Sequence, residues 1–84
     1  MIRVYGDVQG VGFRMFIKRL AEQLGVKGYV RNLIDGSVEI FVEGEGYLIR
    51  RFVEELRLNS PTEIADMVIE NAKPRGFESF YVVP

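Results

Sequence analysis

A glycine-rich segment between an alternating apolar run and a helical pattern constrains this chain most. Residues 6–14 read GDVQGVGFR; the alternation before them begins at Ile2, and the helical pattern begins at Phe13. Glycines let the backbone turn sharply, and a helix start presents unpaired N–H groups at the positive end of its dipole. With Arg14 in the first helical turn, the segment predicts a strand–loop–helix unit that can hold an anion.

The segment differs from two common nucleotide-binding loops. A Walker A loop ends in Gly-Lys-Ser/Thr, which is missing here, and a dinucleotide fingerprint beginning at Gly10 would need glycine where Met15 stands. From this segment alone, the alternative interpretation is an ordinary tight turn followed by a solvated arginine.

Length and composition exclude several classes of protein. The 84 residues predict one domain over residues 1–84, and a hydrophobic content of 48% is enough for one modest core. Cysteine and histidine do not occur, which excludes disulfides and thiolate chemistry and removes the commonest general base. A net charge of −1 argues against a nucleic-acid binder. Without an apolar run of membrane-spanning length or a signal peptide, we expect a cytoplasmic protein with no membrane partner.

Hydrophobic periodicity and turn residues predict two helices and five strands. The Asp35-Gly36 pair favours a hairpin, Glu43 and Glu45 suit the start of the second helix, and Pro61 follows its end. The strands are expected at Ile2–Tyr5, Val26–Leu33, Ser37–Val42, Ile64–Glu70 and Phe77–Val83, and the helices at Phe13–Leu24 and Tyr47–Leu56. This order predicts an α+β, ferredoxin-like split βαβ sandwich: βαββαβ plus a C-terminal edge strand, with both helices on one face of a mainly antiparallel sheet.

The predicted topology brings a second polar residue to the glycine loop. The strand at 26–33 must run parallel to the first strand, so its far end lies beside the loop. Asn32 shares a face with Gly28 and Val30, because side chains alternate along a strand. If the helices cover that face, the Asn32 amide points toward the loop. Asparagine is also an ordinary turn residue, but with the loop at the same edge we favour a functional role.

These two segments resemble the acylphosphatase family. The resemblance rests on residues 4–14 and on residues 28–32, GYVRN, which are followed by Gly36, Val38 and Gly44 at the family's spacing. Together with the element order, it covers essentially the whole chain.

The resemblance implies roles for individual residues. Arg14 and the loop amides would bind the phosphate of a substrate, and Asn32 would orient the attacking water. The implied phosphate-binding loop consists of Val8, Gln9, Gly10, Val11, Gly12 and Phe13.

The implied reaction is hydrolysis of the carboxyl–phosphate anhydride bond of small acyl phosphates by metal-independent, in-line attack of water. A carboxylate leaves without protonation, so this chemistry needs neither histidine nor cysteine. The products would be a carboxylate and inorganic phosphate. We expect a monomer without metal or cofactor, and with no nucleic-acid partner.

Two other functions fit the same fold. A non-catalytic acylphosphatase-like binding module is one, since similar domains occur in larger carbamoyl-transfer proteins that mature hydrogenases. A single-stranded nucleic-acid binder is the other, with Tyr5 and Phe41 as stacking platforms on the open sheet face. The strand at 37–42 lacks the basic–glycine–aromatic signature of such binders, which disfavours this reading.

Overall fold

The chain alternates strands and helices in the predicted order. The computed structural model describes residues 1–10 and 12–84. The elements are β1 (Ile2–Gly6), α1 (Phe13–Leu24), β2 (Lys27–Asn32), β3 (Val38–Glu43), α2 (Gly46–Asn59), β4 (Ile64–Ile69) and β5 (Phe80–Val82). The prediction of an α+β, ferredoxin-like fold is confirmed. Neither α1 nor α2, the helices of the described residues, has the length and apolar character needed to cross a membrane.

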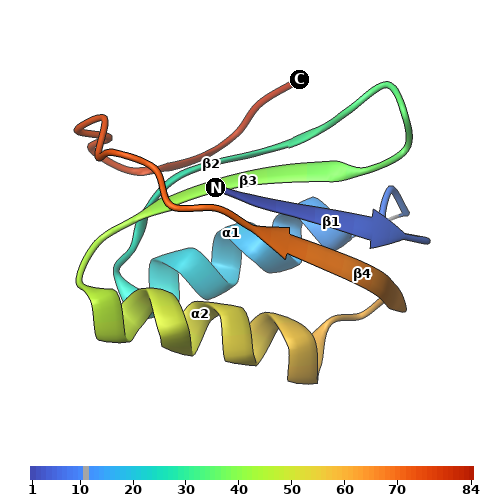
Figure 1. Cartoon of the computed structure of the whole chain (residues 1–84), viewed down its shortest axis with the longest axis horizontal. Helices are drawn as coiled ribbons and strands as arrows, with labels where there is room; N and C mark the ends of the chain where they lie inside the picture. Colours follow the sequence, from blue (N-terminus) through green and yellow to red (C-terminus); the bar gives the residue numbers. More distant parts are fainter. Residues whose placement is uncertain (11) are drawn as a thin grey trace.

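The sheet has the strand order β4-β1-β3-β2-β5. β3 lies between β1 and β2 and is antiparallel to both, so β1 and β2 run in the same direction. β4 is antiparallel to β1, and β5 pairs in parallel with β2 at the other edge, where the last strand was predicted. Both helices lie on one side of the sheet (Figure 1). The loop after β1 and the end of β2 therefore lie at the same end of the molecule.

The core fills the space between the helices and the sheet. Apolar residues recur on α1 at the three- and four-residue spacing of one helical face, and the helix ends at Gly25 in the left-handed conformation. Burying one such side chain contributes about 1.5–3 kcal/mol. The side chains that α1 and α2 bury are Phe13, Ile17, Leu20, Ala21, Phe52 and Leu56, and the strands contribute Ile2, Val4, Val30, Val38, Ile40, Val42 and Phe80.

The second helix is longer than predicted. It begins at Gly46 and ends at Asn59 rather than Leu56. Ser60 has extended backbone angles, φ −57° and ψ 134°. The residue before a proline is disfavoured from helical geometry, so Pro61 ends the helix but only after one further turn. Placing Glu43 at the helix start was wrong, because Glu43 is the last residue of β3 and Glu45 is the N-cap.

The last strand is shorter than the predicted Phe77–Val83. The Glu43 carboxylate keeps the segment before β5 out of strand pairing, because it accepts hydrogen bonds from three successive amides of that segment. These are Arg75 at 2.8 Å, Gly76 at 3.2 Å and Phe77 at 2.6 Å. The first hydrogen bond to β2 is made by the Ser79 carbonyl, which accepts the Gly28 amide at 3.0 Å, and residue pairing with β2 begins at Phe80. The limits of the other strands differ from the predicted ones by one residue.

Candidate functional site

The loop between β1 and α1 is anchored in the core at both ends. Val8 and Phe13 have no exposed surface, at 0% each, whereas Gln9, Gly10 and Gly12 are exposed. Gly12 is the N-cap of α1 and has a φ of +90°, a conformation that glycine adopts without strain. The predicted loop residue Val11 lies outside the described residues. Two buried side chains thus fix the loop ends and leave its middle at the surface.

Several backbone donors of this loop are unpaired. Among residues 1–10 and 12–84, the amides of Gln9, Gly10 and Gly12 have no hydrogen-bond acceptor. The Phe13 nitrogen lies 3.5 Å from the Gly10 carbonyl oxygen, a long contact. The N-cap residue of α1 makes no side-chain cap bond, and the first turn of the helix has no acidic residue. The positive end of the helix dipole is thus not neutralised locally, which favours an anion here.

Arg14 lies in the first turn of α1 and is half-buried. Its Nη1 donates to the Val83 carbonyl oxygen at 3.5 Å. The ion pairs found within residues 1–10 and 12–84 involve Arg3, Arg31 and Arg51 instead. No carboxylate of the described chain therefore neutralises the Arg14 guanidinium, whose donors suit phosphate oxygens.

Asn32 is the last residue of β2 and lies on the face that the helices cover. Its partner across the ladder is Val38, and both Val38 and Val30 are completely buried in the core. The Asn32 Oδ1 atom is buried and has no hydrogen-bond donor among the residues described. An unsatisfied buried acceptor costs about 1–3 kcal/mol and is rare in folded proteins. Such an atom is available to a donor that a ligand or water supplies.

Hydrogen bonds bring the loop, Arg14 and Asn32 to one end of β2. Arg14 contacts Val83, and the Val83 amide donates to the Val30 carbonyl at 3.0 Å. Gln9 Nε2 donates to the Leu33 carbonyl at 2.7 Å. These contacts connect the start of α1, through Val83, to Val30 and connect the loop to Leu33, so they lie on either side of Asn32. The contact with Val83 could not be predicted from the sequence, because Val83 accepts the Arg14 hydrogen bond through its backbone carbonyl.

The opposite face of the same strands carries a paired polar network. Tyr29 and Arg31 on β2 each donate to the Glu39 Oε2 atom at 2.8 Å, and Arg3 Nη2 on β1 lies 3.6 Å from Glu39 Oε1. Burial alone would raise the pKa of Glu39, but the Tyr29 and Arg31 hydrogen bonds and the positive charges of Arg31 and Arg3 outweigh it and hold the pKa below its ordinary value. This carboxylate joins three strands and has no part in the loop site.

The open face does not offer Phe41 as a stacking platform. Phe41 is only 1% exposed. The Tyr29 ring stacks on it at a centroid distance of 5.9 Å, and the Arg75 guanidinium lies 4.3 Å from its ring centroid. A nucleic-acid base could therefore not stack on Phe41 without displacing these neighbours, which weakens the nucleic-acid reading further.

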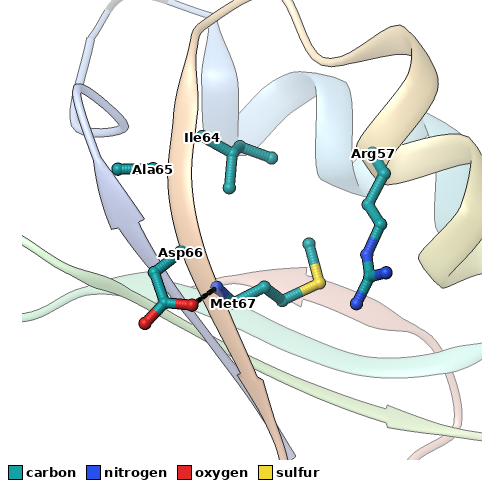
Figure 2. Close-up of a pocket in the computed structure, with 5 residues that line it drawn as sticks. All are labelled: Arg57, Ile64, Ala65, Asp66 and Met67. Atoms are coloured by element: carbon teal, nitrogen blue, oxygen red, sulfur yellow. Dashed lines mark hydrogen bonds between the residues drawn. The ribbon is translucent and has the colours of Figure 1, made fainter.

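A surface hollow of about 340 Å³ lies at the β4 edge of the sheet, opposite the edge formed by β5. Arg57 and Met67 face each other across it, while the Asp66 carboxylate turns back to accept the Met67 amide at 2.8 Å (Figure 2). None of the predicted site residues lines this hollow. Within the described residues, acidic side chains do not gather in threes as a metal site would require.

Comparisons with known proteins agree on one family. The family model Acylphosphatase matches residues 1–82. The acylphosphatase of Thermotoga petrophila is 49% identical over 82 residues, which cover 96% of this chain and 91% of that protein. The crystal structure of acylphosphatase from Bacillus subtilis matches with a TM-score of 0.91 and 38% identity, covering 99% of this chain and 94% of that one.

A third match shows the same fold inside a longer protein. Full-length HypF, in a phosphate- and nucleotide-bound form, matches with a TM-score of 0.88 and 32% identity over 99% of this chain but only 11% of HypF. By contrast, this chain spans nearly the full length of the acylphosphatases from Thermotoga petrophila and Bacillus subtilis. The family match and the relatives' identity over almost every residue show that this protein belongs to the acylphosphatase family.

Proposed function

We propose that this acylphosphatase hydrolyses small acyl phosphates with Arg14, Asn32 and the amides of the loop at 8–13. Membership of the family gives the reaction class, a hydrolase acting on acid anhydrides. The assignment of residues is supported above all by Asn32 Oδ1, a buried acceptor left without a donor at the end of β2 that the loop contacts.

Phosphate binding is the task of the loop and Arg14. The unpaired amides and the start of α1 offer donors to the phosphoryl oxygens, and the Arg14 guanidinium adds a permanent positive charge. The transition state of phosphoryl transfer spreads charge over these oxygens, so donors fixed beforehand stabilise it without reorganisation. The long Val83 contact leaves most of the guanidinium donors for the substrate.

Asn32 holds the attacking water. Its Oδ1 accepts a hydrogen bond from the water, whose oxygen then faces phosphorus opposite the leaving group. The new bond joins the water oxygen to phosphorus, and the bond to the acyl oxygen breaks with its electron pair going to the carboxylate. A phosphoryl oxygen takes the proton of the water, so the products are a carboxylate and inorganic phosphate.

The leaving group sets the substrate class. A carboxylate departs without protonation, whereas the alkoxide of a phosphate monoester needs an acid that the proposed site does not contain. We therefore expect hydrolysis of acetyl phosphate and benzoyl phosphate and poor hydrolysis of phosphate monoesters. The reaction is proposed to need neither metal nor cofactor, so a chelator should leave the rate unchanged.

Arg14→Ala and Asn32→Ala test the assignment with acetyl phosphate. Loss of the Arg14 donors should lower kcat/KM by at least about 10²–10³-fold, as removal of an electrostatic donor does. Asn32→Ala should lower kcat by on the order of 10²-fold while the Ki of inorganic phosphate changes little. Parental rates in both variants would contradict the proposed residues, and a parent with no turnover would favour the non-catalytic module.

Location and assembly complete the proposal. We propose a cytoplasmic monomer over residues 1–84 that binds no nucleic acid. Size-exclusion chromatography with light scattering tests whether the protein is a monomer. Titration with single-stranded RNA tests whether it binds nucleic acid. A salt-sensitive, tight complex with RNA would contradict it.

A further inference from the structure

Gln9 lies in the phosphate loop, but its side chain does not face a substrate. Its Nε2 atom donates to the Leu33 carbonyl at 2.7 Å and to the Ser37 carbonyl at 2.8 Å. A primary amide has two N–H donors, and both are used here. The side chain therefore has no donor left for a phosphate and offers it only an acceptor oxygen. Of Gln9, only the backbone amide can serve the anion.

Both acceptors belong to the closing pair of the β2–β3 hairpin, directly after Asn32. The Leu33 amide donates to the Ser37 carbonyl at 2.9 Å, and the Gly36 amide donates to the Leu33 carbonyl at 3.1 Å. The Asp35 Oδ1 atom accepts the Ser37 amide at 2.9 Å and the Ser37 hydroxyl at 2.6 Å. The turn is thus held by its own hydrogen bonds. The side-chain amide of Gln9 adds a second donor to the Leu33 carbonyl and to the Ser37 carbonyl.

From this geometry we infer that Gln9 is a positioning residue that sets the phosphate loop relative to Asn32. The loop and β2 come from separate parts of the chain, so no covalent constraint fixes the phosphate against the water that Asn32 holds. The two hydrogen bonds of the Gln9 side chain, one to Leu33 directly after Asn32 and one to Ser37 across the hairpin, supply that constraint. The inference rests on the proposed function, because it acts through Asn32.

The role predicts a kinetic signature that a purely structural residue lacks. Arg14 and the loop amides bind the phosphate, so loosening the tether should leave phosphate affinity unchanged. Alignment of the water with phosphorus should suffer, because in-line attack is sensitive to displacements of an ångström or less. The effect should therefore fall on kcat and not on the Ki of inorganic phosphate.

Gln9→Met tests this directly, since methionine keeps the length of the side chain but has no N–H donor. Gln23→Met, at an exposed position on α1, is the matched control. With acetyl phosphate we expect kcat of Gln9→Met to fall about tenfold, less than the hundredfold that a 1 Å misplacement can cost, with the Ki of phosphate and Tm little changed. Gln23→Met should behave as the parent. A parental kcat in Gln9→Met, or a Ki that weakens in parallel with kcat, would overturn the inference.

Combining Gln9→Met with Asn32→Ala separates the two proposals. If Gln9 acts through Asn32, its loss should have almost no further effect once Asn32 is alanine, and the effects should be strongly non-additive. The full tenfold loss in both backgrounds would overturn the inference alone. Parental activity of Asn32→Ala by itself would instead contradict the proposed function.

Discussion

Arg31 and Asn32 are neighbours in β2, yet they lie on opposite faces of the sheet in opposite polar environments. Arg31 donates to Glu39, which also accepts from Tyr29, so these three side chains of the open face are paired with one another. Asn32 Oδ1 is buried on the helix side without a donor in the described structure. Arg14, on the same side as Asn32, lacks the carboxylate partner that Arg31 has.

The difference separates polar groups that stabilise the fold from polar groups that we propose to act on the substrate. A paired network joins β1, β3 and β2 and lowers the free energy of the folded state. Unpaired donors and acceptors at the loop cost stability but remain available to a ligand, which is typical of active sites. Substitutions on the two faces should therefore affect different properties.

The largest contrast is expected between Arg14→Ala and Arg31→Ala. The first should lower kcat/KM for acetyl phosphate by about 10²–10³-fold, because it removes charge from the transition state, and should leave Tm nearly unchanged. The second should leave kcat/KM nearly unchanged and destabilise the protein by about 1 kcal/mol, as an exposed ion pair with a good hydrogen bond does. Steady-state kinetics and thermal unfolding measure both. Equal losses of kcat/KM in the two variants would contradict the separation between a catalytic Arg14 and a stabilising Arg31.

Asn32→Ala should lower activity without lowering stability. The variant loses the acceptor for the attacking water, so kcat should fall on the order of 10²-fold. It also removes a buried acceptor that has no donor, so Tm should stay the same or rise. A marked fall in Tm would indicate that Asn32 is a structural residue of the hairpin.

Glu39→Gln should change stability and its dependence on pH. Because the folded state holds the pKa of Glu39 below its ordinary value of 4.5, the unfolded chain binds more protons in acid and stability rises with pH. The contribution is complete above that ordinary value and is lost as pH falls through the lower pKa of the folded state. Urea unfolding from neutral pH into acid should show a steeper loss for the parent than for Glu39→Gln. Identical slopes would show that the paired network does not stabilise the charged form.

Deletion of Val83 and Pro84 should have the smallest effect. The contact of Arg14 with the Val83 carbonyl is long, at 3.5 Å, so it orients the guanidinium only weakly. We expect a loss of kcat/KM severalfold at most, well below that of Arg14→Ala, since the charge remains. A loss as large as that of Arg14→Ala would show that the C-terminal segment, and not the loop, positions the arginine.

The sequence was sufficient for the fold because its signals are local and agree with one another. The predicted limits of α1 match the structure, since its apolar face begins directly after a glycine and ends at Gly25. The face of Asn32 followed from strand alternation and the direction of β2. Both depend on periodicity, which a single sequence contains.

The contacts that tie the site together could not be predicted, because they involve backbone carbonyls. Gln9 donates to Leu33 and Ser37, and Arg14 donates to Val83, irrespective of the side chains at those positions. Glu43 was misplaced for the same reason, since its partners are amides of residues 75–77 rather than the start of α2. No residue type marks a carbonyl or an amide as a partner.

A crystal structure with bound inorganic phosphate tests most directly whether Arg14 and Asn32 serve the same anion. We predict a phosphate in the loop at residues 8–13, held by the backbone amides and the Arg14 guanidinium, with Asn32 Oδ1 within hydrogen-bond distance of a phosphate hydroxyl or of a water beside the anion. A phosphate bound elsewhere on the chain, or one held by Arg14 with Asn32 out of reach, would contradict the account.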